Sequence, residues 1–349
     1  MSADLSEDER AVVELLRTRG LSIKNMDEEQ KEVIRKFINR LHHEKGVSLS
    51  DIAKIIGNKT SGYTSWLTRQ LGITPRPFEE ARLKAIKEKR RKYPRTPFDG
   101  TVEDRAYFLG LTHGDLTAYH QWRGSITVGM STTHPALAAL FTKLFSPYGH
   151  VYAHPRFKKD TQSYEWNFHT ILDESFNFLK EGPEACRDWV FRTESTLLGY
   201  PAGFLDADGS VSIYSSKGRT TLMLAYFNTD LLLLETAKRG LGLLGYQIRG
   251  PTLSKRKGTK TKRYGIERKK DYWMIGIQSF ARCQELLRRL PLRHAEKVSK
   301  KELAMAPSSR DSWSWVGPKM EEIRQKIKKD RDMYVAEAER IYLENHPNH

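Results

Sequence analysis

The chain has 349 residues, a formal net charge of +16 and only two cysteines. This length leaves room for two or three domains, and two cysteines exclude a disulfide framework or a zinc site. So large a positive charge favours a polyanionic partner. Nucleic acid fits better than a membrane surface, because there is no long apolar run and no lipidation signal. The acidic start of the chain is not a signal peptide, so we expect an intracellular protein.

Residues 1–96 are predicted to form a small all-helical domain. We expect a helix over residues 7–19, and Asp27 caps a second helix whose apolar side chains follow helical spacing. A further helix over residues 79–92 ends in a basic run that suits both a helix C-terminus and contact with phosphates. The prolines and glycine that follow indicate a domain boundary.

Within this domain, residues 48–71 resemble a helix-turn-helix. A short helix over residues 48–57 is followed by a turn and by a second helix over residues 61–71. The side chains that would face a DNA groove are Tyr63, Thr64 and Arg69. The alternative is a helical cap that does not contact DNA.

Two stretches align without a gap and lie 93 residues apart: Tyr107 to Leu116 and Tyr200 to Gly209. Each is an apolar run with small residues four positions apart, which lie on one helix face and let a second backbone come close. We therefore predict a pair of packed helices. Each ends in an acid, Asp115 or Asp208, at the negative end of the helix dipole. Bound divalent cations would relieve the repulsion between these acids, as in metal-assisted phosphodiester cleavage.

The second stretch closely resembles the LAGLIDADG motif of homing endonucleases, and the first is similar to the variant of archaeal-type members. The resemblance covers roughly residues 102–306. It implies an α+β fold with two pseudo-symmetric αββαββα halves, residues 97–192 and 193–306, whose antiparallel sheets bind DNA. Residues 307–349 would form a C-terminal helical tail.

The resemblance also implies the metal site. The family's metal-binding acid is the last one of each motif, which is Asp115 in the first copy and Asp208 in the second. Gly114 and Ala207, which match each other in the alignment, belong to the same site. The family usually has glycine at the position of Leu116, and this departure leaves the acid in place.

In the first half, residues 123–130 alternate between apolar and polar side chains, which predicts a half-buried strand. Two more strands are expected over residues 151–157 and 164–171. A twisted sheet with a polar face can read base edges in the major groove. The candidate DNA contacts are Ser125 and Thr127 on the first strand and Arg156, Lys158 and Lys159 in the loop between the other two.

The order of elements repeats in the second half. A strand over residues 210–214 turns outward its candidate DNA contacts Ser210, Ser212 and Tyr214. Residues 249–270 form the most basic stretch, predicted as a long β-hairpin that contacts the DNA backbone. Its candidate contacts are Arg249, Lys255, Arg256, Lys257, Lys262 and Arg263.

Three further residues have roles that only the resemblance implies. Thr132 and Asn228 hold the position that often orders active-site water in the family. Lys297 precedes the last helix of the second half and would stabilise charge on the phosphate; Arg293 is a weaker candidate, and an exposed lysine without a catalytic role is the alternative. The first half has no clear equivalent lysine, so the site is expected to be asymmetric.

The resemblance implies a monomeric, Mg²⁺-dependent endonuclease that cuts both strands of a specific double-stranded DNA site and leaves staggered ends, as in intron homing. Mn²⁺ or Ca²⁺ would substitute for Mg²⁺ in binding. An RNA maturase that binds intron RNA is a second possibility. A regulator with this fold that binds DNA without cutting it is a third, although the presence of both acids argues against it. In the tail, residues 320–342 predict an amphipathic helix that packs on the core or contacts flanking DNA.

Overall fold

The computed structural model of the chain describes residues 6–18, 26–57, 61–77, 93–121, 124–260 and 265–347. The chain forms two compact units, residues 1–91 and 92–349. The basic helix predicted over residues 79–92 lies outside the described residues. Within the described ranges, no helix is long and apolar enough to cross a membrane.

The first unit is helical, as predicted. Its elements are α1 (Glu7–Thr18), α2 (Glu28–Asn39), the π-helical turn η1 (Arg40–Glu44), α3 (Leu49–Ile55) and α4 (Ser61–Gln70). Asp27 caps α2 by accepting the backbone N–H of Gln30 at 2.8 Å, and Ser48 caps α3 by accepting that of Asp51 at 3.1 Å. The unit has its own apolar core, which includes Leu16, Ile34, Ile38, Leu41, Ile52 and Leu67.

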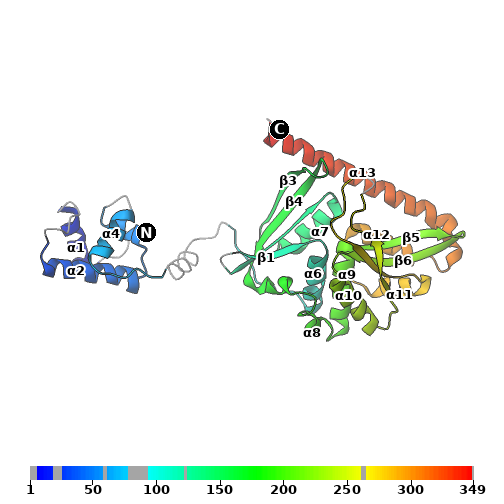
Figure 1. Cartoon of the computed structure of the whole chain (residues 1–349), viewed down its shortest axis with the longest axis horizontal. Helices are drawn as coiled ribbons and strands as arrows, with labels where there is room; N and C mark the ends of the chain where they lie inside the picture. The colour runs from blue at the N-terminus through cyan, green and yellow to red at the C-terminus, as the bar shows by residue number, and fades with distance from the viewer. Residues whose placement is uncertain are drawn as a thin grey trace. The chain divides into compact units, whose positions relative to one another are not determined.

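The second unit contains two halves with the same order of elements (Figure 1). The first half comprises α6 (Val102–Gly114), β1 (Thr117–Gln121), β2 (Ser125–Thr132), α7 (Pro135–Phe145), β3 (Val151–Lys158), β4 (Ser163–Leu172), η2 (Glu174–Lys180) and α8 (Arg187–Val190). The second comprises α9 (Glu194–Asp208), β5 (Gly209–Ser216), β6 (Arg219–Asn228), α10 (Leu231–Leu243), β7 (Arg249–Lys255), β8 (Tyr272–Ile277), α11 (Phe280–Arg289) and α12 (Ala295–Met305).

Each half has one four-stranded antiparallel sheet. The strand orders are β1-β2-β4-β3 and β5-β6-β8-β7, so the two sheets have the same topology. Strand β1 was not predicted from the sequence. It is an edge strand of mostly polar, partly exposed residues, and its sequence therefore lacks the apolar alternation that marks β2.

The motif helices α6 and α9 pack directly against each other between the two sheets (Figure 1). A Cβ atom at Gly110 would overlap the carbonyl oxygen of Tyr200, and one at Gly203 would overlap that of Tyr107. These two contacts are related by the offset of 93 residues between the motifs. The predicted small-residue faces therefore form the interface, and glycine is required on both helices.

The tail forms one turn of 3₁₀ helix, η3 (Arg310–Ser312), and the long helix α13 (Trp313–Asn345). Helix α13 contacts β3 and β4 of the first half and β5 and α12 of the second. Tyr334 of the helix stacks on Trp166 of β4 with 5.5 Å between ring centroids, and Trp313 packs against the main core. The tail is thus part of the second unit.

Candidate active site

The two motif acids stand at the ends of the paired helices. Asp115 is the residue that caps the C-terminus of α6, and Asp208 is the last residue of α9. Burial raises the pKa of Asp115 above its ordinary value. Burial, together with the negative charge of Asp115, raises the pKa of Asp208 to about 7. The centre therefore holds two carboxylates that oppose each other's ionisation, as paired acids do.

Lys297 lies at the same centre and is not an exposed lysine. From the first turn of α12, its Nζ donates to the carbonyl oxygens of Leu205, Asp206 and Ala207, at 2.5, 2.6 and 2.9 Å. All three belong to the last turn of α9, where carbonyls run out of N–H partners within the helix, although the Leu205 carbonyl also accepts from the backbone N–H of Gly209. Burial lowers the pKa of Lys297 to about 8, although the surrounding aspartates act in the opposite direction.

Because all three Nζ protons are used in this way, Lys297 offers a fixed positive charge rather than a free donor. The charge lies at the negative end of the α9 dipole and lowers the pKa of both Asp115 and Asp208. This points to a positioning role for Lys297. Lys180, the nearest basic residue by position in the first half, is exposed at the end of η2.

Thr132 and Asn228 end equivalent strands and make equivalent contacts. The backbone N–H of His134 donates to Thr132 Oγ1 at 3.0 Å, and that of Asp230 donates to Asn228 Oδ1 at 2.9 Å. Asn228 Nδ2 also donates to Asp208 Oδ2 at 3.0 Å. The amide of Asn228 therefore orients the carboxylate of Asp208, whereas the contact recorded for Thr132 is to the backbone of its own turn.

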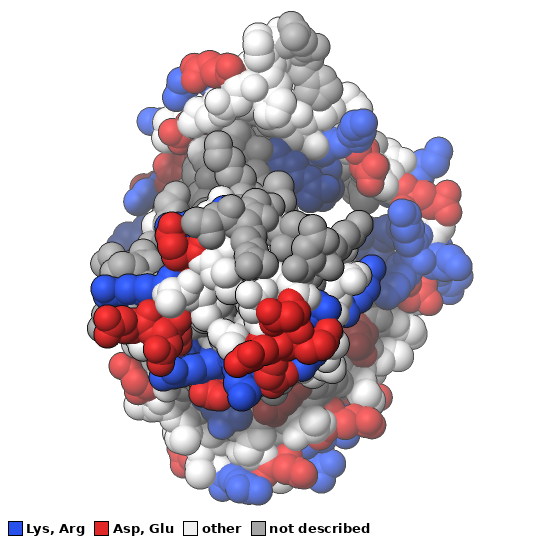
Figure 2. All heavy atoms as spheres, turned by 90° about the vertical axis from the view of Figure 1, so that its left-hand side faces the viewer, with Lys and Arg blue, Asp and Glu red and all other residues white. Residues whose placement is uncertain are grey.

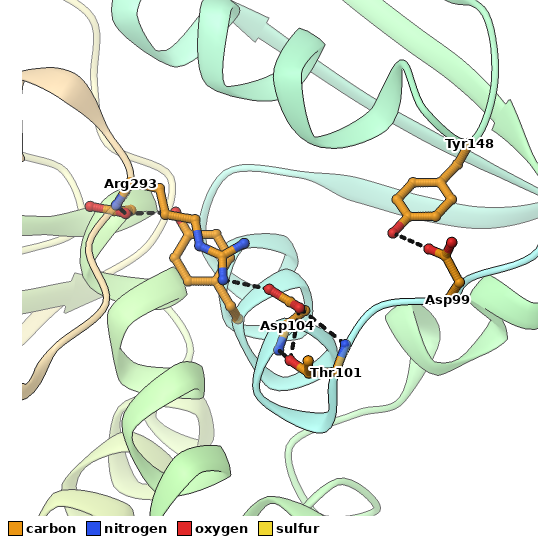
Figure 3. Close-up of polar contacts among 7 residues, drawn as sticks. Asp99, Thr101, Asp104, Tyr148 and Arg293 are labelled. Atoms are coloured by element: carbon orange, nitrogen blue, oxygen red, sulfur yellow. Dashed lines mark hydrogen bonds and ion pairs between the residues drawn. The ribbon is translucent and has the colours of Figure 1, made fainter.

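A third motif acid, Asp206, has a different task. It is 1% exposed, and its Oδ2 accepts from the hydroxyl of Tyr107 at 2.6 Å and from the backbone N–H groups of Arg293 and His294 at 2.6 and 3.1 Å. The Arg293 side chain lies over the Tyr107 ring and donates to Asp104 at 2.5 Å (Figure 3). Asp206 and Arg293 thus anchor the segment that leads into α12, and so place Lys297.

Sequence reasoning missed this network. The signal was present, because Asp206 is a second acid inside an otherwise apolar motif helix and needs a buried partner. What the sequence does not reveal is that the partners are backbone N–H groups of a segment almost ninety residues away. Arg293, the weaker candidate for the role of Lys297, instead donates to Asp104 of α6 in this network.

The acids at the helix ends fit a divalent cation. Their ionisation is opposed by burial and by each other, and a bound cation would remove both penalties. In the described part of the chain, no group of three or more histidine, cysteine or carboxylate side chains could hold a metal ion. A cation at Asp115 and Asp208 would therefore take further ligands from backbone carbonyls, water or the substrate, as Mg²⁺ commonly does. The carbonyl of Ala207 already accepts from Lys297, at 2.9 Å.

On the face of the first sheet that points away from the core, the exposed residues are not the predicted ones. Ser125 and Thr127 are 1% and 2% exposed, so the prediction that they line an open face is wrong. The register places Thr127 between Tyr119 of β1 and Ile171 of β4, and these longer side chains flank its short one. Neither hydroxyl has a hydrogen-bond partner among the described residues.

Other side chains form the accessible surface of this sheet. By register, Tyr119, Tyr152, His154, Arg156 and His169 share the face of Thr127. Tyr119 is 53% exposed, and Tyr152 stacks on His169 with 4.7 Å between ring centroids. Arg156 and Lys158 are exposed but lie on β3 rather than in the loop, while Lys159 is in the turn. Lys158 also pairs with Glu165 at 3.7 Å.

The second sheet agrees better with the predicted face. Ser210, Ser212 and Tyr214 are partly exposed on one side of β5, and Gln278 Nε2 donates to the Tyr214 hydroxyl at 2.5 Å. Arg249, Lys255, Arg256 and Lys257 are exposed along the hairpin that joins β7 to β8. The hairpin continues beyond β7, since Lys260 pairs with Glu267 in an isolated bridge. Lys262 and Arg263 lie outside the described residues.

In the first unit, α3 and α4 occur at the predicted residues, but one candidate DNA contact is wrong. Thr64 is fully buried, and its hydroxyl donates to the carbonyl of Leu49 at 2.8 Å, which ties α4 to α3. Tyr63 is partly buried beside Trp66, and Arg69 is exposed. On the face of the molecule that Figure 2 shows, acidic and basic side chains are interspersed rather than gathered by sign.

No family model matches the chain, and no curated protein matches it. Solved structures similar to it include mesophilic variants of the homing endonuclease I-DmoI, with 18% identity over 55% of this chain and 93% of that one, at a TM-score of 0.34. The N-terminal LAGLIDADG domain of DUF199/WhiA has 12% identity over 64% of this chain and 97% of that one, at a TM-score of 0.34. I-SmaMI bound to uncleaved DNA target with calcium ions has 10% identity over 65% of this chain and 97% of that one, at a TM-score of 0.32.

At these identities and scores, the function of this chain has to be argued from its own residues. Its architecture is nevertheless plain. The paired motif helices, the two sheets of equal topology and the acids at the helix ends form an α+β arrangement of two equivalent halves in one chain, as the sequence resemblance implies.

Proposed function

We propose that this chain is a site-specific endonuclease that hydrolyses both strands of double-stranded DNA with Mg²⁺ and leaves staggered ends. The observation that carries the proposal is the pair of carboxylates, Asp115 and Asp208, at the ends of two helices in van der Waals contact. One chain supplies both acids, so a monomer contains the whole centre.

The residues of the centre have separate tasks in this proposal. Asp115 and Asp208 would hold the cation, with the backbone at Gly114 and Ala207 beside them. When bound there, Mg²⁺ supplies Lewis-acid chemistry, polarising a phosphate oxygen and lowering the pKa of a water molecule. Asn228 holds the Asp208 carboxylate in one orientation. Lys297 keeps the pKa of both acids lower than burial alone would, so that more of the centre is ionised near neutral pH.

The sheets would select the site. Two twisted antiparallel sheets flank the catalytic helices (Figure 1), and strands of this kind can lie in the major groove. The first offers tyrosine, histidine and arginine side chains, and the second offers hydroxyls and a basic hairpin. The exposed Arg69 of α4 would add a contact from the first unit.

The test is a cleavage selection from a randomised duplex library with Mg²⁺, followed by assays of variants on the selected site. Asp115→Asn and Asp208→Asn should each lower the rate by at least about 10³-fold, since a metal ligand contributes several kcal/mol to the transition state. Both should still bind the site, because neither acid lies on the sheet faces. Asp311→Asn, which removes a carboxylate 74% exposed beside Arg219, is the matched control and should cut normally. Undiminished cutting by Asp208→Asn would sink the proposal.

A further inference from the structure

The resemblance to homing endonucleases does not extend to α13, so the role of this helix rests on its own contacts. The indole Nε1 of Trp166 donates to the Tyr334 carbonyl at 3.1 Å, and the rings of Tyr164 and Tyr342 lie 5.5 Å apart. These contacts hold the C-terminal part of α13 on the first half, while its earlier part packs on α12 and β5 of the second. Figure 1 shows it as a single long helix across both halves. Its side chains are therefore held in place relative to both sheets.

One side of α13 closes a basic pocket of about 400 Å³. The pocket lies between α13, α12 and the residue that precedes α7. Its lining residues are His134, Lys300, Arg324, Ile327, Lys328, Arg331 and Asp332. Four lysines and arginines and one histidine thus face a single acid, which concentrates positive potential in the cleft.

Most of this charge is not neutralised within the protein. Arg324 pairs with Glu321 at 3.4 Å, and His134 pairs with Glu296 at 3.3 Å. Among the described residues, no ion pair is made by Lys300, Lys328 or Arg331. Burial lowers the pKa of Lys300; of the nearby charges, Glu296 raises that pKa and Arg324 lowers it. An anion bound in the pocket would favour the charged form of its lysines and arginines.

The pocket adjoins the proposed catalytic centre. Lys300 follows Lys297 by three residues on α12, so both side chains lie on one side of that helix. Lys297 binds the end of α9, next to Asp208. The backbone N–H of His134 donates to the Thr132 hydroxyl at 3.0 Å, and the His134 side chain lowers the pKa of Asp115. A nucleic-acid strand leaving the two acids would therefore pass close to this pocket.

We propose that Lys300, Lys328 and Arg331 form a binding site for backbone phosphates of DNA beside the catalytic centre. This inference rests on the proposed function, because it takes DNA to be the polyanion. In it, α13 adds an electrostatic contact outside the two sheets that is independent of base sequence. Lysine and arginine in a pocket are suited to phosphate oxygens, and each neutralised phosphate releases counterions.

The test measures the affinity of the full chain for a mixed-sequence DNA duplex over a series of salt concentrations. Lys300→Gln, Lys328→Gln and Arg331→Gln are combined in one variant. Lys319→Gln, Lys326→Gln and Lys329→Gln, from the same helix but outside this pocket, are combined in the control. The slope of log K against log salt should fall by roughly 2–3 units in the pocket variant and by less than about one unit in the control. Equal losses, or an unchanged slope in the pocket variant, would overturn the site.

Two further arms keep the outcome interpretable. Lys328→Glu alone changes an exposed side chain and should weaken DNA binding even if the triple variant fails to fold. A slope change seen with an RNA duplex but not with DNA would also overturn the proposal. Asp208→Asn should keep the full slope while losing cleavage. If the protein cleaves DNA but the pocket variant binds DNA normally, only the phosphate site is refuted. If the protein does not cleave DNA but the pocket variant lowers the salt slope, only the nuclease activity is refuted.

Discussion

The two halves of the second unit share one backbone plan but fill its centre with different chemistry. Tyr107 and Tyr200 occupy the same motif position, and each hydroxyl contacts the partner helix two residues before its terminal acid. In the second half the contacted residue is Asp206, whose carboxylate accepts the backbone N–H groups of Arg293 and His294. In the first half it is His113, whose ring lies 2.9 Å from the Tyr200 hydroxyl and 2.8 Å from the Glu181 carbonyl.

This difference reverses the direction of the hydrogen bonds. The Glu181 carbonyl can only accept, so His113 Nε2 must carry the proton, and Nδ1 accepts from Tyr200. Burial lowers the pKa of His113, which keeps it neutral in this arrangement. A carboxylate thus selects a neighbouring segment that presents N–H groups, and an imidazole selects one that presents a carbonyl. Only the N–H segment continues into a helix with a lysine at the catalytic centre, so the asymmetry of the site follows from one motif position.

The packing of the motif helices is the feature that the halves share most fully, and breaking it should have the largest effect. In Gly110→Ala and Gly203→Ala, the new methyl group would overlap a carbonyl oxygen of the partner helix. Each should destabilise the second unit by about 3 kcal/mol or more, measured by urea unfolding. Gly242→Ala, in α10 with no atom near the added carbon, is the control and should be neutral or up to about 1 kcal/mol stabilising. If only one of the two motif variants is destabilised, the halves do not share the interface equally.

The largest effect on catalysis short of removing an acid should come from Lys297, because the first half has no equivalent lysine at the centre. Its charge lowers the pKa of Asp208, so Lys297→Met should raise that pKa above about 7. Asp208 holds a metal only when ionised, and the acidic limb of the cleavage profile should therefore move to higher pH, by roughly one unit. The rate at neutral pH should fall accordingly, by roughly fivefold, while cleavage at alkaline pH falls less.

The matched control for Lys297 is Lys301→Met. Lys301 Nζ donates to the Leu290 carbonyl at 2.8 Å and so binds the end of α11 in the same manner, away from the two acids. It should leave the pH profile in place. If Lys297→Met lowered the cleavage rate equally at every pH, without moving the pH profile, the lysine would act only through the stability of the helix end.

Much of this centre was predictable from the sequence because it depends on local pattern. Helix periodicity places each motif glycine on the same helix face as the small residue four positions later, and it places the acid at the helix end. Both motif helices are observed as predicted. The lysine was found through the resemblance alone. Its three carbonyl acceptors could not be predicted, because they depend on how the Arg293 segment is anchored by Asp206.

The sheet faces were predicted less well, for a physical reason. Strict alternation assigned Ser125 and Thr127 to the correct side of β2, but their exposure depends on the size of the neighbours across the strands. Those neighbours lie on β1, which the sequence did not predict, and on β4. Thr64 fails in a similar way, since its helix face is covered by α3. Exposure is a tertiary property that a periodic pattern alone does not determine.

The sharpest comparison of the halves concerns the two tyrosines. Tyr107→Phe removes a donor from a buried carboxylate and should lower the free energy of unfolding by about 1.5–3 kcal/mol, whereas Tyr200→Phe breaks a neutral bond and should lower it by about 0.5–1.5 kcal/mol. The hydrogen bond from Tyr107 lowers the pKa of Asp206, which burial raises, so its loss raises that pKa further. An acid with a raised folded pKa loses stability as pH rises, and the Tyr107→Phe deficit should therefore grow from acid to mildly alkaline pH. The Tyr200→Phe deficit should stay flat there because His113 is neutral. Equal, pH-independent deficits would mean that Asp206 is not held as a carboxylate and that the two halves do not differ in charge.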